Sequence, residues 1–138
     1  MISLTKHCDT IAVHQTSDIV LARSLARSLS ASLGFGKADQ TRLATAVSEL
    51  TRNVIMHAGS GECRISDVSD ADFKRIEIVV EDQGPGIASI ESAMQDGFST
   101  SGSMGAGLSG TRRLVETFNI VSEPGLTCVT IALSLRRN

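Results

Sequence analysis

Residues 81–87 read Glu-Asp-Gln-Gly-Pro-Gly-Ile and come directly after a β-prone run at residues 74–81. An aspartate at a strand end, here Asp82, can accept a hydrogen bond from an exocyclic amine such as that of adenine. Gly84 and Gly86 carry no side chain, so a flat base can approach the backbone there. The stretch therefore predicts one edge of a nucleotide pocket, and a tight turn after a strand is the alternative.

Upstream, the apolar periodicity predicts a helix from a cap at Asp39 to about Ala58. Glu49 and Asn53 are four residues apart, so they share a face of this helix. That face borders the apolar stripe formed by Leu43, Val47, Leu50 and Val54. An asparagine oxygen is a hard ligand that suits Mg²⁺, and a glutamate one turn away can accept a proton near a transferred phosphoryl group. Two polar residues on a solvated helix face are the alternative.

Downstream, residues 105–110 read Gly-Ala-Gly-Leu-Ser-Gly and open a helix predicted at residues 108–117. Backbone N–H groups at a helix N-terminus favour phosphate. The string also fits the dinucleotide-binding motif, with Glu123 at the distance expected for a ribose contact, but that motif should leave a strand directly. Here a Ser/Gly/Thr-rich loop precedes it. The lysine of a P-loop and the His-Arg-Asp and Asp-Phe-Gly elements of ordinary protein kinases are absent.

The remaining pattern predicts a single α+β domain covering residues 1–138. Further helices are expected at residues 17–33 and 89–95, and strands at residues 10–14, 62–68, 74–81, 118–122 and 127–135. The helix at 17–33 should bury Val20, Leu21, Leu25, Leu29 and Leu33. Because few βαβ units are present, the fold class expected is a two-layer sandwich of helices on a mostly antiparallel mixed sheet.

Composition excludes several classes of partner. A formal net charge of −2 leaves no basic surface for nucleic acid, and 3% aromatic residues provide few platforms for base stacking. No apolar run approaches the ~20 residues that span a bilayer, and the N-terminus lacks the features of a signal peptide. Cys8, Cys63 and Cys128 are scattered and predict reduced thiols. We therefore expect a cytoplasmic protein that binds neither nucleic acid nor membrane.

Taken in order, the three motifs resemble the N box and the two glycine boxes of the GHKL ATPases, the superfamily of gyrase B, Hsp90, MutL and the histidine kinases. Residues 48–53, 81–87 and 96–102 narrow the resemblance to the serine/threonine kinases of bacterial partner-switching systems, closest to the stressosome switch kinases. Residues 33–36, Leu-Gly-Phe-Gly, also fit, and the resemblance covers nearly the whole chain. The chain has no room for the dimerisation helices of a histidine kinase.

This resemblance implies a role for each motif residue. Glu49 would be the general base that takes the proton from a Ser or Thr hydroxyl of the substrate, Asn53 would coordinate Mg²⁺, and Asp82 would bind the adenine amine. Residues 96–104 would form the ATP lid. The implied ATP-binding residues are Asn53, Asp82, Gly84, Gly86, Ile87, Ser99, Thr100, Gly105, Gly107, Leu108, Gly110 and Thr127.

Two positions depart from the family pattern. Relatives often carry Gly-Thr at the start of the last strand, where this chain has Leu126-Thr127. Anti-sigma relatives often carry an arginine just before the second glycine box, where this chain has Ser103. The nearest cations there, Arg112 and Arg113, lie on the following predicted helix, so the source of a side-chain cation at the γ-phosphate stays open.

The function expected from the resemblance is an ATP- and Mg²⁺-dependent protein serine/threonine kinase. Its substrates would be STAS-domain proteins, the scaffold and antagonist of a stressosome-like complex. The kinase would then bind and activate a downstream partner such as a PP2C-type phosphatase. One alternative is an anti-sigma factor kinase that sequesters a sigma factor. Another is a non-catalytic adaptor that uses ATP only as a conformational switch, against which the presence of both Glu49 and Asn53 argues.

Overall fold

The computed structural model describes residues 7–84 and 108–138. In chain order the elements are β1 (His7–Val13), α1 (Thr16–Ser32), α2 (Lys37–His57), β2 (Gly61–Asp67), β3 (Phe73–Asp82), α4 (Leu108–Leu114), β4 (Thr117–Glu123) and β5 (Leu126–Arg136). The helix expected at residues 89–95 and the lid expected at residues 96–104 fall outside the described residues.

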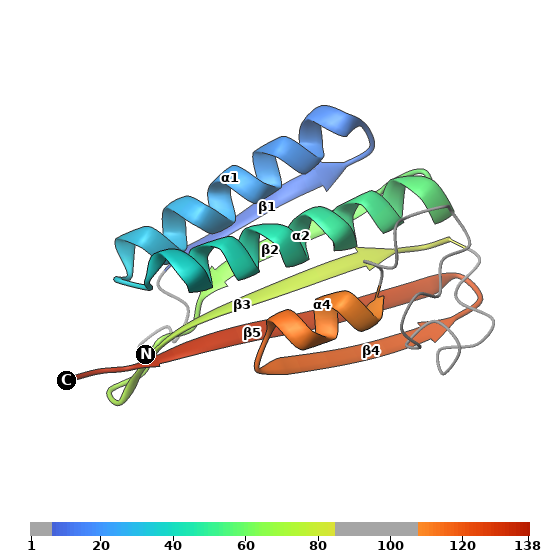
Figure 1. Ribbon diagram of the computed structural model, residues 1–138. Helices are drawn as coiled ribbons and strands as arrows, with labels where there is room; N and C mark the ends of the chain where they lie inside the picture. Colours follow the sequence, from blue (N-terminus) through green and yellow to red (C-terminus); the bar gives the residue numbers. More distant parts are fainter. Residues whose placement is uncertain (1–6, 85–107) are drawn as a thin grey trace.

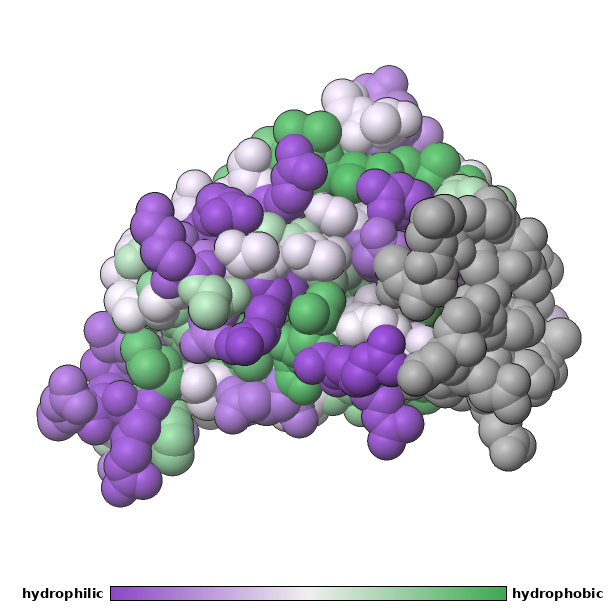
Figure 2. All heavy atoms as spheres, viewed as in Figure 1, coloured by the Kyte–Doolittle hydropathy of each residue, from purple (hydrophilic) through white to green (hydrophobic). Residues whose placement is uncertain are grey.

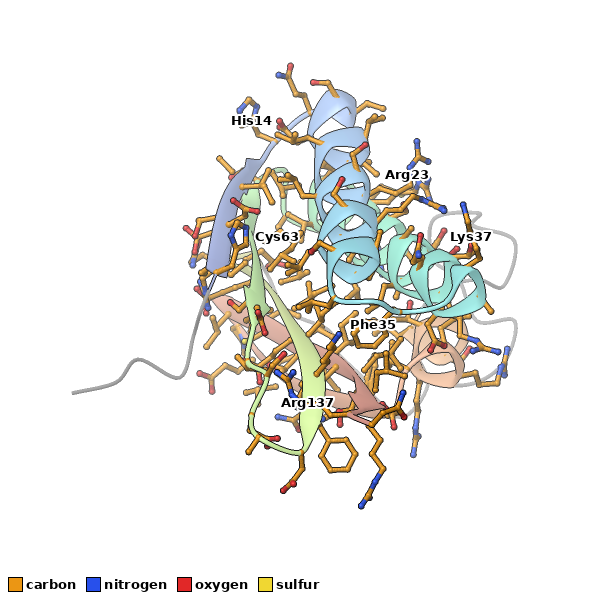
Figure 3. The ribbon with its side chains drawn as sticks, turned by 90° about the vertical axis from the view of Figure 1, so that its left-hand side faces the viewer. His14, Arg23, Phe35, Lys37, Cys63 and Arg137 are labelled. Carbon is orange, nitrogen blue, oxygen red and sulfur yellow. The ribbon has the colours of Figure 1, made fainter. Side chains whose placement is uncertain are left out.

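The five strands form one sheet in the order β1-β2-β3-β5-β4. All four of these strand pairs are antiparallel, which confirms the expected α+β class with a predominantly antiparallel sheet. The helices cover one face of the sheet, and α2 lies between α1 and α4 (Figure 1). Seen along the strands, both long helices stand on the same side of the sheet (Figure 3). This two-layer arrangement is the one predicted.

The core lies between α2 and the sheet. The predicted stripe of α2 (Leu43, Val47, Leu50 and Val54) is buried, as are the alternating residues Ile76, Ile78 and Val80 of β3. The turn between the two long helices contributes Phe35, which is 3% exposed and points toward the sheet (Figure 3). Gly34 precedes it with a φ of +91°, a conformation that glycine adopts without steric cost. The stripe spacing of α2 was therefore a sound predictor of its buried face.

The apolar positions expected on α1 coincide only in part with its buried face. Val20 and Leu21, expected in the core, are each 47% exposed. The buried positions are Ile19, Ala22, Ala26 and Ser30, while Leu25, Leu29 and Leu33 are partly buried at the edge of the core. Small residues at the contact allow α1 to pack closely on α2, so the helix turns its alanines inward and leaves larger side chains at the surface.

Two helix boundaries also differ from the prediction. Gly36, with extended backbone angles, is the N-cap of α2, and the helix begins at Lys37. Asp39 lies inside the first turn, where its carboxylate accepts a hydrogen bond from Arg42 at 2.8 Å. The third helix ends at Leu114 instead of residue 117, because Thr117 already pairs with Ala132 as the first residue of β4.

The surface over the helices is mixed in character. Figure 2 shows hydrophilic side chains spread over this face, with smaller apolar areas among them. Within residues 7–84 and 108–138, no helix combines the length and the apolar character needed to cross a membrane.

Candidate active site

The end of β3 and the start of β5 bring two predicted site residues together. Asp82 and Thr127 are direct partners in the antiparallel register. They are 8% and 9% exposed, and each continues the buried, helix-facing alternation of its strand. Thr127 Oγ1 is also 2.8 Å from the hydroxyl oxygen of Ser122 on β4. The threonine therefore lies beside Asp82 even though Leu126 replaces the glycine that relatives often carry before it.

Gly84 fixes the backbone just after Asp82. Its N–H donates to Asp82 Oδ1 at 2.9 Å, and its carbonyl accepts from the N–H of Gly125 at 2.9 Å. A Cβ added at Gly84 would lie 2.6 Å from the Cβ of Ala58, which caps the C-terminal end of α2. The glycine is thus needed for close approach, because it lets the end of β3 touch both the end of α2 and the β4–β5 turn.

The two carboxylate oxygens of Glu49 have different surroundings. Its side chain is 13% exposed, and Oε1 accepts a hydrogen bond from Arg52 Nη1 at 2.6 Å. Oε2 is buried and has no hydrogen-bond partner among the described residues. A buried polar oxygen without a partner is destabilising, typically by about 1–3 kcal/mol, so its presence calls for an explanation such as a catalytic role or a bound water or ion. Oε2 is therefore available as an acceptor for a group from outside the described chain.

Asn53 lies one helical turn beyond Glu49 on the same edge of α2 and is half-buried. The following residue, Val54, packs against the start of β2, since its Cγ1 would be 2.8 Å from a Cβ at Gly61. That contact places Asn53 in the part of the helix that meets the sheet. The described residues contain no cluster of three His, Cys, Asp or Glu side chains able to hold a metal alone. One amide oxygen does fit Mg²⁺ that is shared with phosphates and water.

The helix after the second glycine motif packs beside α2 (Figure 1). Leu108 begins α4 and is 7% exposed, and Gly110 is half-buried within it. Arg112 and Arg113 are exposed in the last turn of α4. The other predicted ATP-binding residues fall outside the described chain; they are Gly86, Ile87, Ser99, Thr100, Gly105 and Gly107.

Comparison with known proteins is consistent with this geometry. Residues 38–137 match the family described as "Histidine kinase-, DNA gyrase B-, and HSP90-like ATPase". The chain belongs to this ATPase family. It is 51% identical, over 108 residues, to the serine/threonine-protein kinase RsbT of Bacillus subtilis (strain 168), a match that covers 78% of this chain and 81% of that protein. The predicted assignment to the serine/threonine kinases of the ATPase family is thereby confirmed.

Two solved structures share the fold of this ATPase family. The structure of the RsbU and RsbW domains of Rv1364c from Mycobacterium tuberculosis matches with a TM-score of 0.64 and 18% identity, over 94% of this chain. The histidine kinase domain of Erythrobacter litoralis EL346 blue-light activated histidine kinase matches with a TM-score of 0.51 and 20% identity, over 83% of this chain. The present chain spans 33% and 59% of these two chains.

One residue beside Glu49 in the candidate site was missed by the sequence reasoning. Arg52 lies within the N box, but only the structure shows that its guanidinium holds the Glu49 carboxylate. The signal was present, because residues three apart on a helix are surface neighbours and an acidic residue followed by a basic one favours pairing. The spacing alone does not show which of the acidic–basic pairs on α2 borders the candidate active site.

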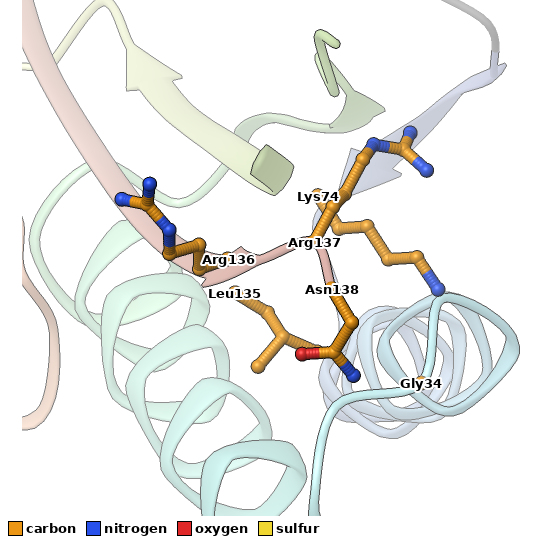
Figure 4. A pocket seen from close by; sticks show the side chains of 6 residues that line it. All are labelled: Gly34, Lys74, Leu135, Arg136, Arg137 and Asn138. Atoms are coloured by element: carbon orange, nitrogen blue, oxygen red, sulfur yellow. The ribbon is translucent and has the colours of Figure 1, made fainter. Parts of the chain in front are cut away.

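A hollow of about 580 Å³ lies at the far end of the sheet and is separate from this site. Its lining residues are Gly34, Lys74, Leu135, Arg136, Arg137 and Asn138. Nine residues of register separate the Phe73–Arg136 pair at that end from the Asp82–Thr127 pair, which is ~30 Å along the strands. The three cations of the hollow point in different directions, so they do not converge on one anion (Figure 4).

Proposed function

We propose that this kinase transfers the γ-phosphoryl group of ATP to a serine or threonine hydroxyl of STAS-domain proteins in a partner-switching pathway. The carrying observation is the buried, unpartnered Oε2 of Glu49, one turn from Asn53 on the same edge of α2. The likeness to RsbT supports the class of reaction, and the motif resemblance supports the class of substrate.

The adenine would be held where β3 meets β5. Asp82 offers a carboxylate to the exocyclic amine, and the N–H of Gly84 holds one oxygen of that carboxylate at 2.9 Å. Thr127 adds a hydroxyl beside Asp82 on the neighbouring strand. The remaining contacts assigned from the motifs are Gly86, Ile87, Ser99, Thr100, Gly105, Gly107, Leu108 and Gly110.

Asn53 would bind Mg²⁺ through its amide oxygen, and the ion would offset the charge of the phosphates. Glu49 Oε2 accepts the proton of the substrate hydroxyl while the oxygen of that hydroxyl attacks the γ-phosphorus. A new oxygen–phosphorus bond forms, the bond from the γ-phosphorus to the bridging oxygen breaks, and ADP leaves. The proton resides on Glu49 until it passes to solvent.

The kinase would then bind a downstream partner once its substrates are phosphorylated. A PP2C-type phosphatase is the partner that we favour. The support is indirect: the resemblance of the motifs to partner-switching kinases implies such a partner, and the chain is similar to the serine/threonine-protein kinase RsbT. A pull-down of the chain with candidate phosphatases, with and without phosphorylated STAS protein, tests this step.

Transfer from labelled ATP with Mg²⁺ to purified STAS-domain proteins tests the reaction. Wild-type protein should produce acid-stable label on serine or threonine, and Glu49→Gln should lower the rate by about 10²–10⁴-fold because it removes the general base. Glu77→Gln is the matched control, since Glu77 lies on β3 with its side chain alternating away from the helix-covered face. Unchanged transfer by Glu49→Gln, or no transfer by wild type, would contradict the proposal.

A further inference from the structure

We propose that Arg52 is a positioning residue for Glu49, which it holds by one carboxylate oxygen so that the other meets the substrate hydroxyl. The inference rests on the proposed role of Glu49 as the base and extends it to a second residue. The N box would then act as a unit in which one side chain accepts the proton and its neighbour fixes the orientation of that acceptor.

The geometry of the pair carries the inference. Arg52 follows Glu49 by three residues on α2, and its Nη1 lies 2.6 Å from Glu49 Oε1. A contact of this length between charged groups is a strong, directional hydrogen bond. A glutamate has three rotatable side-chain bonds, so without a partner its carboxylate would sample several orientations. The guanidinium therefore selects one of them.

Burial shows which oxygen is left for chemistry. Oε1 is occupied by Arg52, whereas Oε2 is buried and has no partner among the described residues. The Arg52 side chain is 43% exposed and that of Glu49 13%, so the arginine lies on the solvent side of the pair. A reacting oxygen must be placed within a fraction of an ångström, and a misplacement of about 1 Å can reduce a rate by 10²-fold.

A double-mutant cycle on substrate phosphorylation tests the inference. Arg52→Met should lower kcat by about 10–100-fold at saturating ATP, with the KM for ATP and the calorimetric Kd for ATP changed by less than about twofold. In the Glu49→Gln background the same substitution should have no further effect, because there is no base left to position. Arg52→Lys, which keeps a cation at the site, should recover part of the loss.

Arg42→Met is the matched control. Arg42 makes the same type of pair with a carboxylate three residues before it, Asp39, at 2.8 Å. It lies ten residues earlier on α2, which is ~15 Å along the helix axis. Arg42→Met should keep wild-type kcat, and circular dichroism should show that both arginine variants are folded.

Two results would overturn the inference alone. If Arg52→Met keeps wild-type kcat, or if it slows the Glu49→Gln variant further, then Arg52 does not act through Glu49, and the second result would place it on the phosphates. If instead Glu49→Gln keeps wild-type turnover, the proposed base is wrong and its positioning residue is wrong with it. The two failures are therefore distinguishable.

Discussion

At the scale of a single residue, Gly84 is the point where the end of β3, the end of α2 and the β4–β5 turn meet. Its N–H holds the Asp82 carboxylate, its carbonyl receives the N–H of Gly125, and its missing side chain leaves room for Ala58. Gly125 has a φ of +92°, a conformation that lets the β4–β5 turn bend back so that its N–H reaches the carbonyl of Gly84. The orientation of Asp82 therefore depends on a residue with no functional group.

Gly84→Ala should lower the free energy of unfolding by about 1–3 kcal/mol, because its Cβ would overlap the Cβ of Ala58 at 2.6 Å. Urea denaturation followed by circular dichroism measures the change. The double variant Gly84→Ala/Ala58→Gly removes the nearest clash and should regain part of the lost stability. A single variant with the wild-type urea midpoint would show that the contact is easily relieved.

At this scale the sequence indicated candidate site residues but not the partners of their side chains. Glu49, Asn53 and Asp82 were predicted from motif spacing, and the structure places each of them at the edge or end of an element. Arg52 was missed because ion pairing depends on side-chain geometry that spacing does not specify. Asp39 was assigned as a cap because its residue type suits that position, yet Gly36 takes the N-cap.

At the scale of elements, the β2–β3 hairpin is held by a small buried network. Asp67 Oδ1 accepts hydrogen bonds from the backbone N–H and the hydroxyl of Ser69. The Ser69 hydroxyl oxygen in turn accepts the backbone N–H of Arg75 at 2.9 Å. Asp67 and Ser69 are 6% and 4% exposed, so water cannot easily replace a hydrogen bond that is lost between them.

Ser69→Ala should lower the free energy of unfolding by about 1–3 kcal/mol. The substitution removes the acceptor of the Arg75 N–H and one of the two donors to Asp67 Oδ1. Thermal or urea denaturation checks the value. Ser32→Ala is the matched control: its exposed hydroxyl donates only to the backbone of Leu29, and the change should stay within about 0.5 kcal/mol. Equal effects of the two substitutions would contradict a special role for the hairpin network.

Element prediction succeeded where one strong pattern dominated. The stripe of α2 identified its buried face because large aliphatic residues recur there with helical spacing. In α1 the large residues were misleading, since close packing against α2 favoured Ala22 and Ala26 at the contact. Strand pairing lay beyond local patterns, because neighbours such as β3 and β5 are far apart in the chain, with α4 and β4 among the residues between them.

At the scale of the whole molecule, the topology assembles the candidate site from distant segments. Asp82 and Thr127 become direct neighbours only because β5 inserts between β3 and β4. The end of α2 reaches the same place through the contact between Ala58 and Gly84. A ligand bound there would join three elements and should therefore stabilise the entire fold.

ATP with Mg²⁺, at about 100 times its Kd, should raise the free energy of unfolding by about 2.7 kcal/mol and the melting temperature by on the order of 10 °C. Asp82→Asn should lose most of this shift, since it replaces a carboxylate acceptor by an amide. Asp72→Asn, an exposed change on the distant hairpin, should keep it. Differential scanning fluorimetry measures all three proteins, and an undiminished shift in Asp82→Asn would contradict the adenine assignment.

The direction of the strands also determines how this domain can be joined to others. His7 pairs with Asp67, and Arg136 pairs with Phe73, so both ends of the described chain lie ~20–30 Å along the strands from Asp82 (Figure 1). A module fused at either end would be tethered at the hairpin side, away from Asp82. Such a fusion would leave the end of β3 at Asp82 and the end of α2 at Ala58 unchanged.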